Sequence, residues 1–276
     1  MPDISDDFSF DPRDVERVVK REHRQSLRRC RRQEHPEAIL LAGQPGAGKT
    51  ELTAAAMAER FSDSCMSING DDYRRFHPDH RNIIARYGDE AADHFSRFSS
   101  AVTESLIDVF SDEGFNLIIE GTCRTVEVPE RTAKILFEKG YRVEIAALAV
   151  HPVSSLLSTA IRLYRMCEHG TVPRVTSIEA HDHVVEVLPG NLDYLSECAF
   201  IDDISIWNRN MDCLYRRSVS DELPSAIIKK QWERTFSEEE LRWMKDMYSD
   251  ISGIELRENL GQERLLQVIA ERLSVL

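Results

Sequence analysis

The feature that most constrains the fold of this chain is a glycine-rich segment, Gly-Gln-Pro-Gly-Ala-Gly-Lys-Thr, at residues 43–50. Its spacing fits the pattern G-x-x-x-x-G-K-[ST] of a phosphate-binding loop. The apolar run 39–41 precedes it, and the run 51–60, rich in strong helix formers, follows it. Because a phosphate-binding loop needs a strand before it and a helix after it, this context favours such a loop over a glycine-rich turn that binds nothing.

Each part of this segment suits the binding of a nucleotide phosphate. Glycines let several backbone N–H groups surround a phosphate, and the following helix presents its positive end. We expect Lys49 to reach the β- and γ-phosphates and the hydroxyl of Thr50 to hold Mg²⁺. The predicted ATP-binding residues are Gly43, Gln44, Pro45, Gly46, Ala47, Gly48, Lys49 and Thr50.

Composition narrows the choice of partners. The formal net charge of −13 argues against a general nucleic-acid binder, which needs an excess of Lys and Arg. The six cysteines are scattered and include no C-x-x-C pair, as expected of reduced thiols rather than of disulfides or a zinc site. No apolar run approaches the roughly 18 residues of a membrane helix, and residues 1–7 are mostly polar, without the apolar core of a signal peptide. We therefore expect a soluble cytoplasmic protein with no nucleic-acid or membrane partner.

Apolar runs and helical patterns alternate along the middle of the chain. Beside the run at 39–41, strands are predicted at 65–70, 115–121, 144–150 and 204–207. This alternation predicts an α/β fold, with a five-stranded, mainly parallel, doubly wound sheet flanked by helices.

Changes in composition divide the chain into three parts. Residues 1–36 form an N-terminal segment that is helical over 14–32, and its mixed charges favour a solvated helix over a basic patch for an acidic partner. Residues 37–216 form the α/β domain. Residues 217–276 form a helical C-terminal extension, with an apolar stripe that includes Ile269. We expect this extension to be a separate appendage that the chemistry does not need.

Polar residues follow two of the predicted strands directly. Asp71 and Asp72 follow the strand at 65–70, and Glu120 ends the strand at 115–121, shortly before Thr122 and Arg124. Ligands of open parallel sheets bind beyond the carboxyl ends of the strands. These side chains could therefore hold a polar, phosphorylated substrate. The alternative, an aspartate that caps the next turn, is stronger for Asp72 than for Asp71.

A helical insert between residues 150 and 204 contains Arg162, Arg165 and Arg174. Phosphoryl-transfer enzymes often use arginines on a mobile segment to neutralise the charge on the γ-phosphoryl group. The alternative for any one of these arginines is solvent or a weak surface ion pair.

Taken in order, these motifs resemble the zeta toxin family, the kinase component of the epsilon–zeta and Pez toxin–antitoxin systems. The resemblance covers about residues 38–209. It rests on the segment 43–50, Gly-Asp-Asp-Tyr-Arg with His-Pro at 70–78, Glu-Gly-Thr-Cys-Arg-Thr at 120–125 with Val128-Pro129, Arg174-Val-Thr, His181-Asp182 and Leu-Pro-Gly-Asn-Leu at 188–192.

The resemblance implies a P-loop kinase fold and an activity. Members of that family use ATP and Mg²⁺ to phosphorylate the 3′-hydroxyl of the amino sugar in UDP-N-acetylglucosamine, and an antitoxin protein that occludes the ATP site neutralises them. Asp71 matches the base that accepts the proton of the sugar hydroxyl. Lys49, Arg162 and Arg174 match contacts to the ATP phosphates. The positions that match UDP-sugar contacts are Glu104, Glu120, Thr122, Arg124 and Thr132.

Two other functions stay open at this point. The same fold could phosphorylate another UDP-sugar or a small alcohol. A nucleotide-binding switch without phosphotransfer is a different class, but a GTPase switch would need Asn-Lys-x-Asp, and the chain has no Asn-Lys pair. An inactive kinase should have lost its base or its arginines, whereas Asp71, Lys49, Arg162 and Arg174 are all present.

Overall fold

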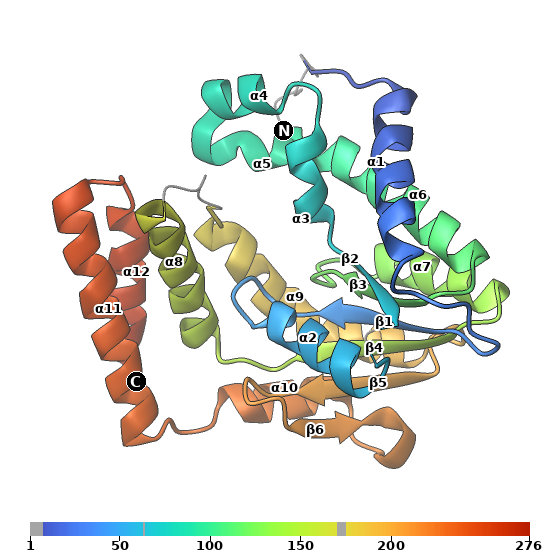
Figure 1. Cartoon of the computed structure of the whole chain (residues 1–276). Helices are drawn as coiled ribbons and strands as arrows, with labels where there is room; N and C mark the ends of the chain where they lie inside the picture. The colour runs from blue at the N-terminus through green and yellow to red at the C-terminus, as the bar shows by residue number, and fades with distance from the viewer. Residues whose placement is uncertain (1–7, 63, 170–174) are drawn as a thin grey trace.

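The computed structural model describes residues 8–62, 64–169 and 175–276. Its centre is a six-stranded sheet of order β2-β3-β1-β4-β5-β6 (Figure 1). The first five strands of this order run parallel, and β6 pairs with β5 antiparallel. The strands are β1 Glu37–Ala42, β2 Cys65–Ile68, β3 Asn116–Glu120, β4 Arg142–Leu148, β5 Asp203–Trp207 and β6 Cys213–Arg216.

The sixth strand corrects the predicted count of five. β6 spans only Cys213–Arg216, forms the edge of the sheet, and buries Tyr215 alone. Four residues are too few to show a periodic pattern, and the exposed Cys213 and Leu214 stand next to the buried Tyr215 without an alternation of polar and apolar residues. Its pairing with β5 has a register shift between Ile206 and Trp207.

Helices surround the sheet and extend beyond the carboxyl ends of its strands (Figure 1). The longer helices are α1 Pro12–Ser26, α2 Lys49–Glu59, α4 His80–Tyr87, α6 Ser96–Asp112, α7 Glu127–Glu138, α8 Pro152–Glu168, α9 Ile178–Ser196, α10 Pro224–Trp232, α11 Glu238–Glu258 and α12 Glu263–Ser274. The shorter ones are α3 Gly70–Tyr73, α5 Ala91–His94 and the 3₁₀ turns Arg74–Phe76, Gly88–Glu90 and Arg217–Val219.

The main core lies on both faces of the sheet, and β1 shows how the sequence builds it. Alternate side chains of a strand point to opposite faces. Ala38 and Leu40 pack into the cluster formed with α1, α6, α7, α9 and α10, whereas Ile39 and Leu41 pack into the cluster formed with α2. Every residue of β1 after Glu37 is buried, which explains why the run 39–41 is apolar without a break.

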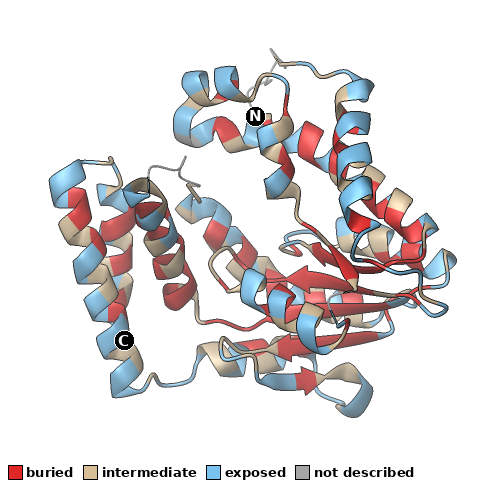
Figure 2. Ribbon diagram, viewed as in Figure 1, coloured by how far each residue is buried: buried red, intermediate tan, exposed pale blue. Residues whose placement is uncertain are grey.

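A second core joins the C-terminal extension to the α/β domain. Residues on one side of α8, among them Leu156 and Tyr164, share a buried cluster with residues of α11 and α12, among them Ile269. Figure 2 shows buried segments of these three helices facing one another. The hydroxyl of Tyr164 donates a hydrogen bond of 2.7 Å to the buried carboxylate of Glu255 in α11. Separability of 217–276 stays a prediction, but removal of these helices would expose an apolar face of α8.

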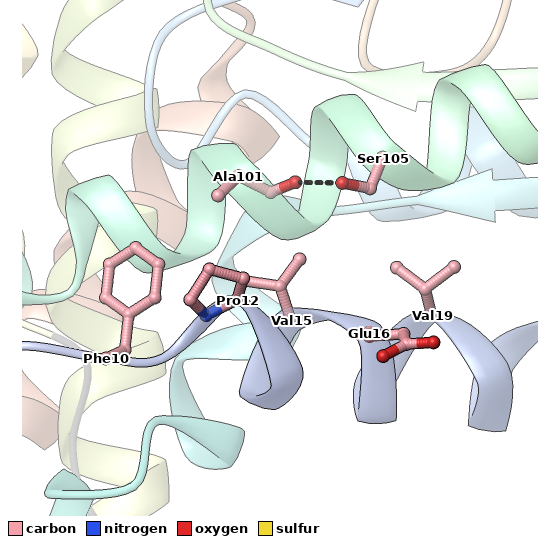
Figure 3. A pocket seen from close by; sticks show the side chains of 7 residues that line it. All are labelled: Phe10, Pro12, Val15, Glu16, Val19, Ala101 and Ser105. Atoms are coloured by element: carbon pink, nitrogen blue, oxygen red, sulfur yellow. Dashed lines mark hydrogen bonds between the residues drawn. The ribbon is translucent and has the colours of Figure 1, made fainter.

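An apolar groove lies between α1 and α6. Figure 3 shows Phe10, Pro12, Val15 and Val19 on one side, and Ala101 and Ser105 of α6 on the other. None of the residues predicted for the functional site lines it.

The second core supports a prediction about stability. Ile269 is completely buried, so Ile269→Ala should lower the free energy of unfolding by about 2–5 kcal/mol, through lost burial and a residual cavity. Leu256 on α11 is 89% exposed, and Leu256→Ala should change that energy by no more than about 0.5 kcal/mol. Urea unfolding of both variants measures the difference. Equal effects would show that α12 contributes little to the stability of the folded chain.

Candidate active site

The glycine-rich segment forms the turn between β1 and α2, as its sequence predicts. Gly46 and Gly48 have φ angles of 78° and 101°, in the left-handed region that L side chains rarely adopt. α2 begins at Lys49, and no described side chain caps its first turn. Its N-terminal N–H groups are therefore left for a ligand at the positive end of the helix.

The turn packs directly on the first part of α8. A Cβ atom added at Gly46 would overlap the carbonyl oxygen of Ser155 and lie 3.0 Å from a methyl group of Thr159. A second contact comes from beyond β5, where Arg209 donates one hydrogen bond of 2.8 Å to the carbonyl of Gly46 and another of 2.9 Å to the hydroxyl of Ser158. Only glycine allows this approach, and the half-buried guanidinium of Arg209 holds the two elements together.

Lys49 lies at the centre of the candidate site. Its ammonium donates hydrogen bonds to the carbonyls of Gly43 (2.7 Å) and Gln44 (3.3 Å). Burial lowers the pKa of Lys49 to about 8; the charges of Glu120 and Asp71 oppose this shift, and Arg162 adds to it. The structure therefore brings these predicted site residues into one electrostatic neighbourhood.

Glu120 links the ends of two strands. Its carboxylate, at the end of β3, accepts hydrogen bonds from Thr53 of α2 (3.4 Å) and from the side-chain amide of Asn69 (3.1 Å), directly after β2. Burial raises the pKa of Glu120, while the charge of Lys49 acts in the opposite direction. Because β2 and β3 are adjacent and parallel, the polar side chains at their carboxyl ends lie close together, as the sequence predicts.

Asp71 lies in the first turn of the short helix α3. Its backbone N–H donates to the side chain of Asn69, which caps this helix, at 3.0 Å. Its carboxylate, 44% exposed, pairs with Arg74 at 2.5 Å. Asp72, by contrast, is an exposed residue. Both aspartates are close enough to Glu120 for their charges to raise its pKa, so the choice of Asp71 over Asp72 stays a prediction.

The remaining predicted residues lie on three other elements. Glu104 of α6 is exposed and pairs with Arg131 of α7 at 2.6 Å. Thr122 and Arg124 lie in the loop after β3, the first half-buried and the second exposed, and Thr132 is half-buried in α7. Thr50, in the first turn of α2, is exposed.

The predicted arginines come from the segment around α8. Arg162 of α8 donates a hydrogen bond of 3.3 Å to the hydroxyl of Thr176. Arg174 lies outside the described residues. Arg165, the third arginine of the insert, pairs with Glu168 and with Asp250 of α11 at the surface.

Several residues that support the site were not predicted to do so. Asn191 of α9 donates a hydrogen bond of 2.8 Å to the carbonyl of Cys123, whose φ of 51° is unusual for a residue with a side chain. Burial raises the pKa of the Cys123 thiol to about 12. Arg209 and Asn191 lie within the segment that carries the family resemblance, but no spacing rule reveals which distant backbone group a side chain will bind.

Two searches bear on other kinds of site. Among the described residues, no helix is long and apolar enough to cross a membrane. The same residues contain no group of three or more His, Cys, Asp or Glu side chains that could hold a metal ion by themselves.

The mixed sheet and the helices that flank it define this protein as an α/β protein with a kinase-like fold. Comparison with known proteins identifies the family: a model of the family described as Zeta toxin matches residues 20–220. This chain belongs to the zeta toxin family.

The similarity extends over most of the chain. It is 35% identical to Toxin zeta of Streptococcus pyogenes over 211 residues, which are 76% of this chain and 73% of that protein. It is 39% identical to Toxin PezT of Streptococcus pneumoniae over 181 residues, 65% of this chain and 71% of PezT. A chain from the structure of the PezAT chromosomal toxin–antitoxin system of Streptococcus pneumoniae matches with a TM-score of 0.80 and 30% identity, covering 89% of this chain and 98% of that one.

A more distant likeness concerns the fold alone. A chain in the crystal structure of AvrRxo1-ORF1:-ORF2 with ATP matches with a TM-score of 0.54 and 12% identity, covering 85% of this chain and 79% of that one.

The contact at Gly46 generates a prediction. Gly46→Ala should destabilise the fold by about 1–2 kcal/mol for the left-handed backbone, plus about 1–3 kcal/mol for the overlap with α8. Gly140 has a similar φ of 82°, but nothing lies within 4 Å of an added Cβ, so Gly140→Ala should cost only the first amount. Urea unfolding compares the two variants. A Gly46→Ala variant as stable as Gly140→Ala would mean that the turn can move away from α8.

Proposed function

We propose that this protein is an ATP-dependent kinase that phosphorylates the 3′-hydroxyl of the amino sugar of UDP-N-acetylglucosamine and acts as the toxin of a toxin–antitoxin system. The observation that carries this proposal is the convergence of Asp71, Glu120 and Arg162 on Lys49 at the glycine-rich turn, in a chain that belongs to the zeta toxin family. A phosphate-binding cation and a candidate base therefore lie in the same small region.

The nucleotide side of the proposed site is the turn at 43–50 with the start of α2. Its backbone N–H groups would hold the phosphates, and the ammonium of Lys49 would exchange its hydrogen bonds to Gly43 and Gln44 for phosphate oxygens. Arg162 and Arg174 would neutralise charge on the transferred group.

The residues present suit a magnesium ion that arrives with the nucleotide. Mg²⁺ keeps several waters and commonly binds through one or two protein oxygens together with substrate phosphates, so a dedicated cluster of ligands is not required. The exposed hydroxyl of Thr50, at the positive end of α2, would be its protein ligand. Bound there, the ion would supply positive charge that offsets the negative charge of the phosphates.

On the acceptor side, an alcohol needs a base within hydrogen-bond reach. The carboxylate of Asp71 is fixed through its backbone by Asn69 and is accessible enough to receive the proton of the sugar hydroxyl as that oxygen attacks the γ-phosphorus. Glu104, Glu120, Thr122, Arg124 and Thr132 would bind the UDP-sugar. Glu120 is the most firmly oriented of these groups, because Thr53 and Asn69 both donate to it.

A cytoplasmic location and a protein antitoxin that occludes the ATP site complete the proposal. The solved relative belongs to a toxin–antitoxin system, and its similarity covers nearly the whole of its own length. A different UDP-sugar is the nearest alternative. A nucleotide switch without phosphotransfer is less well supported, because the chain has no Asn-Lys pair for a GTPase motif and belongs to the zeta toxin family.

Measurement of ATP consumption with a panel of UDP-sugars tests the function. We expect turnover with UDP-N-acetylglucosamine and Mg²⁺, and none when the metal is chelated. Turnover with another UDP-sugar only would correct the acceptor. ATP binding without turnover on any sugar would favour the switch.

Two matched aspartate variants serve as controls in the same assay. Asp71→Asn keeps size and hydrogen bonding but cannot accept a proton, so kcat should fall by about 10² or more with little change in ATP binding. The exposed Asp72 offers the comparison, and Asp72→Asn should remain near the wild-type rate. The reverse pattern would show that Asp72 is the base.

The pKa of Lys49 predicts how ATP binding depends on pH. Bound phosphate requires the ammonium form, and the free protein loses this proton above about pH 8. ATP affinity should therefore be nearly level up to about pH 7, be about halved at pH 8, and fall further above it, approaching about tenfold per pH unit. Lys49→Arg stays charged in this range and should give a level profile, whatever its affinity. Calorimetric titration measures the ATP affinity of wild type and of Lys49→Arg across this pH range. If the two affinities fall in parallel, the group that titrates is not Lys49.

The lowered pKa of Lys49 also affects the stability of the fold, in the direction opposite to its effect on ATP affinity. Between about pH 8 and the usual lysine pKa near 10.5, the unfolded chain binds more protons at this position than the folded chain. The contribution of Lys49 to the free energy of unfolding should therefore rise with pH across that interval.

A further inference from the structure

A continuous set of polar contacts runs from the glycine-rich turn into the helices behind it. The side-chain amide of Gln44 donates to the backbone carbonyl of Val150 (2.6 Å) and to the hydroxyl of Ser155 in α8 (3.3 Å). The Ser155 hydroxyl lies 2.8 Å from Nε2 of His181 in α9, and Nδ1 of His181 lies 2.9 Å from the carboxylate of Asp182.

The last member of this set comes from the end of the C-terminal extension. Arg272 of α12 donates from both terminal nitrogens to Asp182, at 2.8 and 2.5 Å, 90 residues away in the chain. Two parallel hydrogen bonds between a guanidinium and a carboxylate fix direction as well as distance. The relay, here meaning Arg272, Asp182, His181, Ser155 and Gln44, therefore joins α12 to the turn.

Burial makes the relay hard to replace by other partners. Gln44, Ser155 and His181 have no exposed surface, and buried polar atoms need partners inside the protein. Gln44 Oε1 has no hydrogen-bond partner among the described residues, so the orientation of this amide depends on the bonds made by its nitrogen. Without the bond to Ser155, the carbonyl of Val150 would be the single acceptor for the side-chain amide of Gln44 among the described residues.

The order serine, histidine and aspartate also occurs in nucleophilic enzymes, but the environment here excludes that role. A nucleophile must reach its substrate, and Ser155 is completely buried beneath the turn, next to Gln44. What these three groups can do is fix one another's orientation.

The charge of Arg272 determines how the relay is oriented. Its hydrogen bonds are the largest influence that lowers the pKa of Asp182, so this carboxylate is ionised and accepts from Nδ1–H of His181. Burial lowers the pKa of His181, opposed by Asp182 and reinforced by Arg272, and the ring is neutral. Its Nε2 is then an acceptor for the Ser155 hydroxyl, for whose proton the carbonyl of Pro152, at 3.0 Å, competes. The Ser155 oxygen is left to receive the amide of Gln44.

We propose that Arg272 is a positioning residue for the phosphate-binding turn: through Asp182, His181 and Ser155 it fixes Gln44, so that helix α12 contributes to nucleotide binding. This inference rests on the proposed function of the turn. It does not require Arg272 to touch ATP.

The chain contains a matched control for Arg272. Arg264, two turns earlier in α12, pairs with Glu179 of α9 at 3.0 Å, so it joins the same two helices. The side chains of this pair are 81% and 67% exposed, and the pair has no connection to Gln44 among the described contacts. An exposed pair of this kind contributes little to stability.

The test compares Arg272→Ala, Arg272→Lys and Arg264→Ala in the full chain, after circular dichroism has established that each is folded. Mg·ATP affinity is measured by calorimetry, and KM is measured for ATP and for the UDP-sugar. Arg272→Ala should weaken ATP binding and raise the KM for ATP by about two- to thirtyfold, the range found for residues that act through others. The KM for the sugar should stay unchanged. Arg272→Lys should restore part of the loss, and Arg264→Ala should match wild type.

Ser155→Ala interrupts the relay at a second point and removes only one oxygen. If both residues act through the same relay, the double variant Arg272→Ala/Ser155→Ala should bind ATP about as weakly as the more damaged single variant. Additive losses would overturn the proposal. In the control pair, the effects of Arg264→Ala and Ser155→Ala should add.

The outcomes separate this inference from the function on which it rests. Wild-type binding of ATP with equal affinities for Arg272→Ala and Arg264→Ala would overturn the relay and leave the kinase proposal standing. Failure of the wild-type chain to bind ATP would overturn both. If Arg272→Ala does not fold, Arg272→Lys and Ser155→Ala decide: wild-type affinity in both variants would refute a positioning role.

Discussion

The contact between Gly46 and the backbone of α8 is the constraint on which the candidate site depends. A Cβ atom at Gly46 would overlap the carbonyl of Ser155, so the turn and the first part of α8 are fitted to each other without a side chain between them. Arg209 reinforces the contact by donating to both elements. α8 also carries Arg162, so the same contact determines where that guanidinium lies relative to Lys49. A shift of α8 would therefore move the phosphate-binding backbone and a candidate catalytic charge together.

The electrostatics of the site follow from this close packing. Burial of a lysine disfavours its charged form, and Lys49 keeps a pKa near 8 because Glu120 and Asp71 partly compensate for lost hydration. The compensation is reciprocal, since the charge of Lys49 counteracts the effect of burial on Glu120. The ammonium of Lys49 has internal partners in the turn, and a polyphosphate would compete with the carbonyls of Gly43 and Gln44 for it. The site can therefore bind an anion, and the buried ammonium of Lys49 still has hydrogen-bond partners when no anion is bound.

Local sequence patterns predicted the parts of the fold that local physics determines. The run 39–41 and the glycine spacing fix β1, the turn and α2, and acidic residues after two strands that are neighbours in a parallel sheet placed Asp71 and Glu120 together. The structure divides residues 88–112 into a 3₁₀ turn, α5 and α6, and Phe95, at the boundary between α5 and α6, is buried in a small cluster with Ile83 and Ala91. β6 was missed because it is short and exposed. The hydrogen bond between Gln44 and Ser155 joins residues that are 111 positions apart in the chain. No sequence periodicity predicts which two buried polar groups will pair over such a separation.

The C-terminal extension shows how a correct local prediction can leave a functional consequence hidden. The apolar stripe of α12 predicted a helix that buries one face, and Ile269 is completely buried in the cluster with α8 and α11. The stripe could not reveal that the covered helix is also the one on which the phosphate-binding turn rests. One side of α8 packs against α11 and α12 through residues such as Leu156, while Ser155, the preceding residue, contacts the turn. Since a helix transmits displacement along and across its axis as a rigid body, support for its apolar side is also support for the site. Stability of the extension and precision of the turn are therefore coupled through one helix, even though no residue of the extension was predicted to bind a substrate.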